Sequence, residues 1–178
     1  MTLRGAPARF VVLRIDLSDR SELARREAAR FVQVTELARE EAQLRNEQWG
    51  MALDDEGYRF LVLDRETNRW AAVERRPFGS HELDDAIRMR LNVSDRGRIG
   101  GAQPTALTRD TGGQRPDLLL LSSGEMTPFD LALVAADGSG SDDRADAVHV
   151  GSDGFSRVAL KAAPDAVRPP SSTVFGGA

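Results

Sequence analysis

Apolar residues between positions 20 and 47 recur with the period of an α-helix. One broad face of that helix carries Leu23, Phe31, Val34, Leu37, Ala38, Ala42 and Leu44, and the opposite face carries Arg25, Glu36, Arg39, Glu40 and Gln43. Asp19, followed three residues later by Glu22, has the spacing of a capping box that begins a helix. The pattern predicts an amphipathic helix of about seven turns over roughly residues 20–47, packed on another part of the molecule.

On either side of this helix the hydrophobic period changes to two, which is typical of half-buried strands. Before the helix, residues 10–17 predict one short strand. After Gly50 the predicted strands are 51–53, 58–63, 70–73, 87–93, 118–121, 129–135, 148–150 and 155–160. Three pairs flank short turn sequences and predict β-hairpins, at 51–63, 118–135 and 148–160. A long helix followed by about seven or eight short strands predicts an α+β fold, with the helix on an antiparallel sheet.

The remaining segments are rich in glycine, proline and polar residues. Residues 94–117 carry little periodicity and predict a long loop, and residues 137–146 predict another. From residue 162 to residue 178 the composition predicts a flexible tail. The two tryptophans, Trp49 and Trp70, are expected in the core under the helix.

Composition narrows the possible functions. The chain of 178 residues has no cysteine, so disulfides and thiolate metal sites are excluded, and its two histidines, His81 and His149, lie far apart in sequence. We therefore expect no metal site and no cofactor. The net charge of -4 does not favour a nucleic-acid surface, because phosphate binding needs an excess of Lys and Arg.

The polar segment between the apolar runs 118–121 and 129–135 is the strongest candidate for catalysis. Ser122 and Ser123 lack the Gly-x-Ser-x-Gly context of a nucleophile elbow, and no histidine lies near them in sequence. A structural turn explains the same residues, because Gly124 permits a positive φ and Pro128 fixes the entry to the next strand. We therefore expect no enzymatic activity and no catalytic residue. A hydrolase that uses Ser123 and a histidine is the alternative, which Ser123→Ala would test.

Two charged groups are weaker candidates for binding. Acidic residues at 54–56 and at 142–143 could bind calcium, although neither run has the spacing of an EF-hand. Arg88, Arg90, Arg96 and Arg98 form a basic cluster for which a solvated strand face is the simpler interpretation.

Several short motifs, in order, resemble the minor pseudopilin H family of type II secretion systems. They are LAREEA at 37–42, WGM at 49–51, GYRF at 57–60, LSSGEMTPF at 121–129 and GSDG at 151–154 followed by Arg157. The resemblance covers about residues 20–161, which would form the globular domain, whereas residues 1–19 match nothing in the family pattern. It implies an N-terminal helix packed on a β-sandwich in the periplasm, and a non-catalytic subunit that assembles with the other minor pseudopilins and the major pseudopilin.

Family members begin with a short leader, a Gly-Phe junction and about twenty apolar residues, none of which this sequence contains. Membrane attachment is therefore expected only through an N-terminal helix that is absent from this chain. The candidate partner-contact face is the polar helix side, formed by Arg25, Glu36, Arg39, Glu40 and Gln43. Charge reversal at Arg39 is expected to impair partner binding and to leave the domain folded. The alternative is a type IV minor pilin involved in pilus assembly or DNA uptake.

Overall fold

The computed structural model describes residues 9–93, 115–136 and 147–161. This part of the chain forms one helix, α1 (Arg9–Arg45), and nine strands. The strands are β1 (Trp49–Asp54), β2 (Gly57–Asp64), β3 (Arg69–Ala72), β4 (His81–Glu82), β5 (Ile87–Asn92), β6 (Leu118–Leu120), β7 (Phe129–Ala135), β8 (Val148–Ser152) and β9 (Ala159–Lys161). The predicted α+β class is confirmed.

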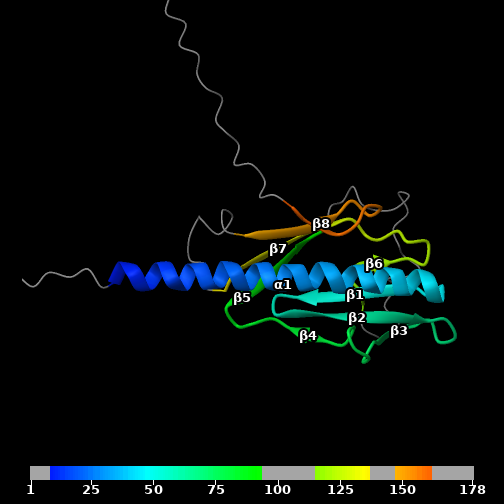
Figure 1. Ribbon diagram of the computed structural model, residues 1–178. Coiled ribbons are helices and arrows are strands. Elements are labelled where there is room, and N and C mark those ends of the chain that lie inside the picture. Colours follow the sequence, from blue (N-terminus) through cyan, green and yellow to red (C-terminus); the bar gives the residue numbers. More distant parts are fainter. Residues whose placement is uncertain (1–8, 94–114, 137–146, 162–178) are drawn as a thin grey trace, which may run out of the picture.

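The strands form two antiparallel sheets, and α1 runs across both of them (Figure 1). One sheet has the order β3-β2-β1-β6, with β4 also paired to β2, and the other has the order β5-β7-β8-β9. The predicted hairpins at 51–63 and 148–160 are confirmed as the pairs β1–β2 and β8–β9.

The face of α1 that packs on the sheets is built largely from small side chains. The buried helix residues are Ala24, Ala28, Phe31, Val34, Thr35, Ala38 and Ala42. Phe31 is the large exception, and its ring meets Tyr58 of one sheet at 5.2 Å and Phe129 of the other at 6.1 Å. Because alanine allows close approach, the helix backbone lies near the sheets while Phe31 fills the space between them.

Two leucines predicted for this face lie outside the core. Leu37 is 48% exposed and Leu44 is 83% exposed. The buried stripe follows the alanines, and this rotates both leucines toward solvent. The predicted helix is confirmed over its central part, and part of its predicted apolar face, at Leu37 and Leu44, lies outside the core.

The predicted strand at residues 10–17 is also wrong, because α1 begins at Arg9 and includes this segment. Adding residues to an existing helix costs far less than starting a new element, since each residue brings one further hydrogen bond. The alternation of apolar residues at 10–17 is therefore overridden by continuation of the helix. Within the described residues, no helix combines the length and apolar character needed to cross a bilayer.

The predicted hairpin at 118–135 is wrong in its pairing. β6 pairs with β1, where Leu118 lies opposite Met51, whereas β7 pairs with β5 and β8 in the other sheet. A short antiparallel connection does form close to the turn, since the Thr127 N–H donates to the Leu119 carbonyl oxygen at 2.9 Å. After this connection the chain passes from one sheet to the other, so the two strands separate.

The two tryptophans lie on opposite faces of the first sheet. Trp49 is buried in the main core, where its ring meets Phe78 at 5.0 Å. Trp70 packs with Leu61 and Leu119 in a second, smaller cluster. Because Phe60 and Leu61 are adjacent in one strand, their side chains point to opposite faces, and the second cluster is on the face away from the helix. The prediction for Trp49 is confirmed, and Trp70 is buried but not under the helix.

Candidate functional site

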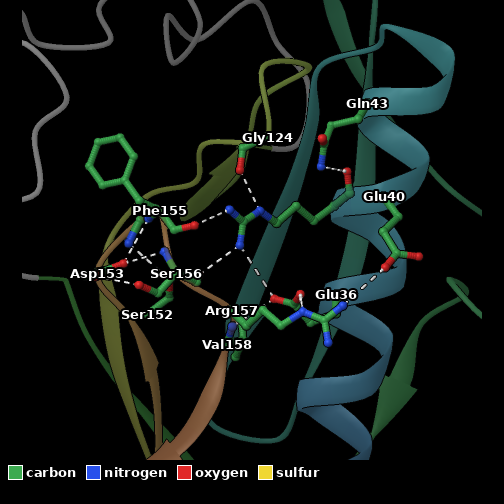
Figure 2. A network of polar contacts seen from close by, with 12 residues as sticks. Glu36, Glu40, Gln43, Gly124, Ser152, Asp153, Phe155, Ser156, Arg157 and Val158 are labelled. Atoms are coloured by element: carbon green, nitrogen blue, oxygen red, sulfur yellow. Dashed lines mark hydrogen bonds and ion pairs between the residues drawn. The ribbon is translucent and has the colours of Figure 1, made fainter.

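Arg39, in the last third of α1, holds two loops that lie far from it in sequence. Its Nε donates to the Gly124 carbonyl oxygen at 2.5 Å, its Nη1 to the Ser156 carbonyl oxygen at 2.9 Å, and its Nη2 to the Phe155 carbonyl oxygen at 2.6 Å (Figure 2). The side chain is 12% exposed. We call Glu36, Arg39, Gly124 and residues 155–158 the Arg39 site.

Glu36 completes this site from one turn earlier in the helix. Its Oε1 accepts a hydrogen bond from the Val158 N–H at 2.8 Å and lies 3.7 Å from Arg39 Nη1. Its Oε2 lies 3.7 Å from Nε of Arg157. The carboxylate therefore balances the largely buried guanidinium and also binds the main chain just before β9.

The loop that supplies two of the carbonyl groups is built by its own polar residues. Asp153 Oδ1 accepts from the N–H groups of Ser156 at 2.7 Å and Phe155 at 2.9 Å. These hydrogen bonds favour the ionised carboxylate, and they hold the pKa of Asp153 below its ordinary value of 3.8. Ser152 Oγ accepts from the Gly154 N–H and donates to the Ser156 carbonyl oxygen, both at 3.0 Å. The loop is thus held by its own hydrogen bonds as well as by those from Arg39.

The second loop is the turn that the sequence singled out. Gly124 has φ of 90°, and its N–H donates to the Leu121 carbonyl oxygen at 2.9 Å. Residues with a side chain rarely adopt this conformation, which explains glycine at this position. The two loops also bind each other, because the Met126 N–H donates to the Gly154 carbonyl oxygen at 2.9 Å.

An open hollow of about 460 Å³ lies over the Arg39 site. Its lining comes from the outer side of α1, the turn at 123–125, Phe155 and Arg157. The lining is mixed, with carboxylates, guanidinium groups and one aromatic residue. Such an open, charged depression suits contact with another protein better than enclosure of a small apolar ligand.

The five residues of the candidate partner-contact face do not share one environment. Arg25, Glu40 and Gln43 are exposed, whereas Glu36 and Arg39 are turned toward the loops. The sequence does not reveal this difference, because a charged helix residue normally faces water and no local pattern identifies carbonyl groups that are 85 to 117 residues away. Because Arg39 binds three main-chain carbonyl groups, charge reversal at Arg39 is now expected to destabilise the domain and not to leave its fold unaffected.

The structure does not bring a histidine to the serines of the turn. His81 Nε2 lies 2.8 Å from Glu27 Oε2, and His149 Nδ1 lies 3.2 Å from Asp130 Oδ1. Ser122 Oγ accepts instead from Gln48 Nε2 at 3.0 Å. This geometry favours the structural interpretation of the turn.

The charged groups considered for ion binding have ordinary structural roles where they are described. Asp54 Oδ1 accepts from the Glu56 N–H at 3.0 Å and so closes the β1–β2 turn. Arg88 donates to main-chain carbonyl oxygens of Asp85 and Ile87. Within residues 9–93, 115–136 and 147–161, no three metal-binding side chains come together. The acidic pair at 142–143 and the arginines at 96 and 98 lie outside the described residues.

The arrangement of one long helix on two antiparallel sheets is shared with minor pseudopilins. The minor pseudopilin EpsH of Vibrio cholerae aligns with a TM-score of 0.62 at 24% identity, over 81% of this chain and 99% of that one. A second EpsH structure gives 0.58 at 23% identity, over 78% and 96%. The solution structure of E. coli GspH gives 0.56 at 22% identity, over 83% and 94%. These similarities define the class of fold.

Sequence comparison identifies the family within this class. The model of the Type II transport protein GspH family matches residues 27–154. Type II secretion system protein H of Pseudomonas aeruginosa strain PAO1 is 30% identical over 129 residues, which are 72% of this chain and 70% of the relative. The chain belongs to the GspH family, and it is a type II secretion minor pseudopilin. The alternative of a type IV minor pilin is not favoured.

Proposed function

We propose that this protein acts by binding neighbouring pseudopilins in the type II secretion filament, and that it carries out no catalysis. The observation that carries the proposal is membership of the GspH family, whose members are structural pseudopilin subunits. In this role the globular domain, residues 20–161, lies in the periplasm and adds a specific surface to the assembly that exports folded proteins. We further propose that the domain is attached to the inner membrane through an N-terminal apolar helix, as the family resemblance implies.

The exposed members of the polar helix side are the proposed contacts. Arg25, Glu40 and Gln43 are exposed on α1, so a partner can reach them without disturbing the fold. Glu36 and Arg39 fix the two loops beside this surface through hydrogen bonds to main-chain groups. Their contribution to partner binding is therefore indirect.

Pairwise binding with the other pseudopilins of the same organism tests this function. The full chain is mixed with the periplasmic domain of the major pseudopilin and of each other minor pseudopilin, and association is measured by calorimetry and by co-purification. We expect at least one specific pair. Deletion of the gene is expected to block secretion of type II substrates, and expression of the protein from a plasmid should restore it. Normal secretion in the deletion strain, together with no binding to any pseudopilin, would reject the proposal.

A further inference from the structure

Phe155 is a large apolar side chain that the Arg39 site holds outward. It is 68% exposed. Figure 2 shows its ring pointing away from α1, while its carbonyl oxygen accepts from Arg39. Burial of an aromatic ring lowers the free energy of the folded state, and the exposed ring of Phe155 contributes little of this stabilisation.

The main chain on both sides of this ring is fixed. The Phe155 N–H donates to Asp153 Oδ1 at 2.9 Å, and its carbonyl oxygen accepts from Arg39 Nη2 at 2.6 Å. Ordering a loop on association costs free energy, and a loop that is already ordered avoids this cost. A rigid aromatic side chain with two rotatable bonds is therefore suited to anchor an interface.

Two further exposed apolar residues lie on α1 next to one residue of the hollow's lining, although neither of them lines the hollow itself. Leu37 and Leu44 are both exposed, and Glu40, which lines the hollow, is between them in sequence. At spacings of three and four residues, the three side chains fall on one side of the helix. Phe155 is thus the large apolar residue of the hollow itself, and the two leucines are exposed on the neighbouring part of α1.

The charge of this surface is acidic. Of the residues that line the hollow, Glu36, Glu40 and Glu125 supply carboxylates, against the guanidinium groups of Arg39 and Arg157. Arg39 is committed to three carbonyl oxygens. Arg157 is 82% exposed and only loosely paired, at 3.7 Å from Glu36 and 4.0 Å from Glu40, so it can move aside. A partner that brings Lys or Arg to the rim would gain electrostatic attraction.

We propose that Phe155 is the anchor of a protein–protein interface, whose partner surface has an apolar depression bordered by Lys or Arg. The occupant is a neighbouring pseudopilin of a different kind in the same filament, so this inference rests on the proposed function. Phe155 inserts into the depression, and Glu40 pairs with the basic border. The Arg39 site serves to keep the anchor in place.

The experiment measures binding of the full chain and its Phe155→Ala variant to the periplasmic domains of the other pseudopilins. The side chain of Phe155 takes no part in the main-chain hydrogen bonds, so the variant should fold, with a Tm close to that of the wild type. We expect the Kd for the partner to rise at least tenfold. Phe155→Leu, which keeps an apolar anchor, should recover most of the affinity. Glu40→Gln should weaken binding less and reduce its dependence on salt concentration.

Val93→Ala is the matched control. Val93 is 42% exposed and follows β5, at the opposite edge of the sheet from β9, so its truncation should leave the Kd unchanged. Equal affinity of the wild type and Phe155→Ala for every pseudopilin that binds would overturn the inference and leave the proposed function intact. Self-association that Phe155→Ala abolishes, with unchanged binding to other pseudopilins, would overturn the choice of occupant. A wild-type chain that binds no pseudopilin would reject the function and this interface together.

Discussion

The helix is attached to its two sheets by different kinds of contact. On the side of the sheet β5-β7-β8-β9, Arg39 and Glu36 bind main-chain groups of two loops. On the side of the sheet β3-β2-β1-β6, the contacts join side chains, such as His81 with Glu27 and Arg75 with Glu41. A side chain that binds main-chain carbonyl groups fixes the course of a loop, whereas an ion pair fixes only the distance between two side chains. The first attachment therefore shapes the surface beside it, and the second mainly adds stability.

Replacement of Arg39 by alanine should have the largest effect. It removes three charge-assisted hydrogen bonds and leaves the carbonyl oxygen of the buried Gly124 without its donor, so the free energy of unfolding should fall by about 3 kcal/mol. Lysine cannot form the same planar fork of donors, so Arg39→Lys should recover only part of the loss. Denaturant unfolding measures the change. Arg25→Ala, an exposed arginine on the same helix, should stay within about 0.5 kcal/mol of the wild type, and equal losses for the two variants would contradict the structural role of Arg39.

Gly124→Val tests the conformation of the turn that Arg39 holds. A valine at φ of 90° is strained, and the free energy of unfolding should fall by more than about 1 kcal/mol. Thermal and denaturant unfolding provide the measurement. Gly79→Ala is the matched control, because a Cβ atom there meets nothing closer than 3.6 Å and the backbone needs no positive φ. An unchanged Tm for Gly124→Val would show that the turn does not require glycine.

Loss of the His81–Glu27 pair should have a smaller effect than loss of Arg39. Both side chains are about one-fifth exposed, at 19% and 18%, and solvent weakens their attraction. We expect Glu27→Gln to lower the free energy of unfolding by no more than about 1 kcal/mol. Arg26→Ala, which removes an exposed pair with Glu22, should have almost no effect. If Glu27→Gln destabilised the protein as much as Arg39→Ala, the contrast between the two attachments would be lost.

The smallest effect should come from protonation of Asp153. Because the folded state lowers the pKa of this carboxyl group, the ionised form contributes stability at pH values above its ordinary pKa of 3.8. That contribution is lost as the pH falls through the lower pKa of the folded state. The difference in Tm between the wild type and Asp153→Ala should therefore be constant above about pH 5 and shrink in stronger acid. A difference that grew on acidification would contradict the assigned direction.

The local elements were predictable from sequence, and the long-range pairings were not. The β1–β2 hairpin follows from two apolar runs and a turn that lie next to one another, so the pattern contains all the necessary information. The pairing of β6 with β1 depends on chain segments more than sixty residues apart, and the nearer partner, β7, was chosen in its place. Alternation cannot distinguish these choices, because it assigns side chains to faces but does not identify the neighbouring strand.

The candidate site was predictable only in part. The motifs at 121–129 and 151–154 correctly drew attention to two loops, and Gly124 was identified as a turn residue. The sequence does not show that both loops bind Arg39, because an arginine on a helix is normally a solvated residue. The sequence pattern also does not show which face of the helix is buried. Large residues such as Leu37 and Leu44 dominate a hydrophobic pattern, whereas the alanines between them determine which face can approach a sheet closely.

The pairing of Met51 with Leu118 also has a consequence for biosynthesis. A chain that emerges from its N-terminus can form α1 and the β1–β2 hairpin early, but one edge of β1 stays open until β6 arrives. Contacts between distant segments form slowly, because a long loop must first close. During this interval an incomplete chain presents an unsatisfied row of peptide groups, which is a site for aggregation. Truncations that end before Leu118 should therefore be recovered as insoluble material, whereas those that end after Lys161 should be recovered folded.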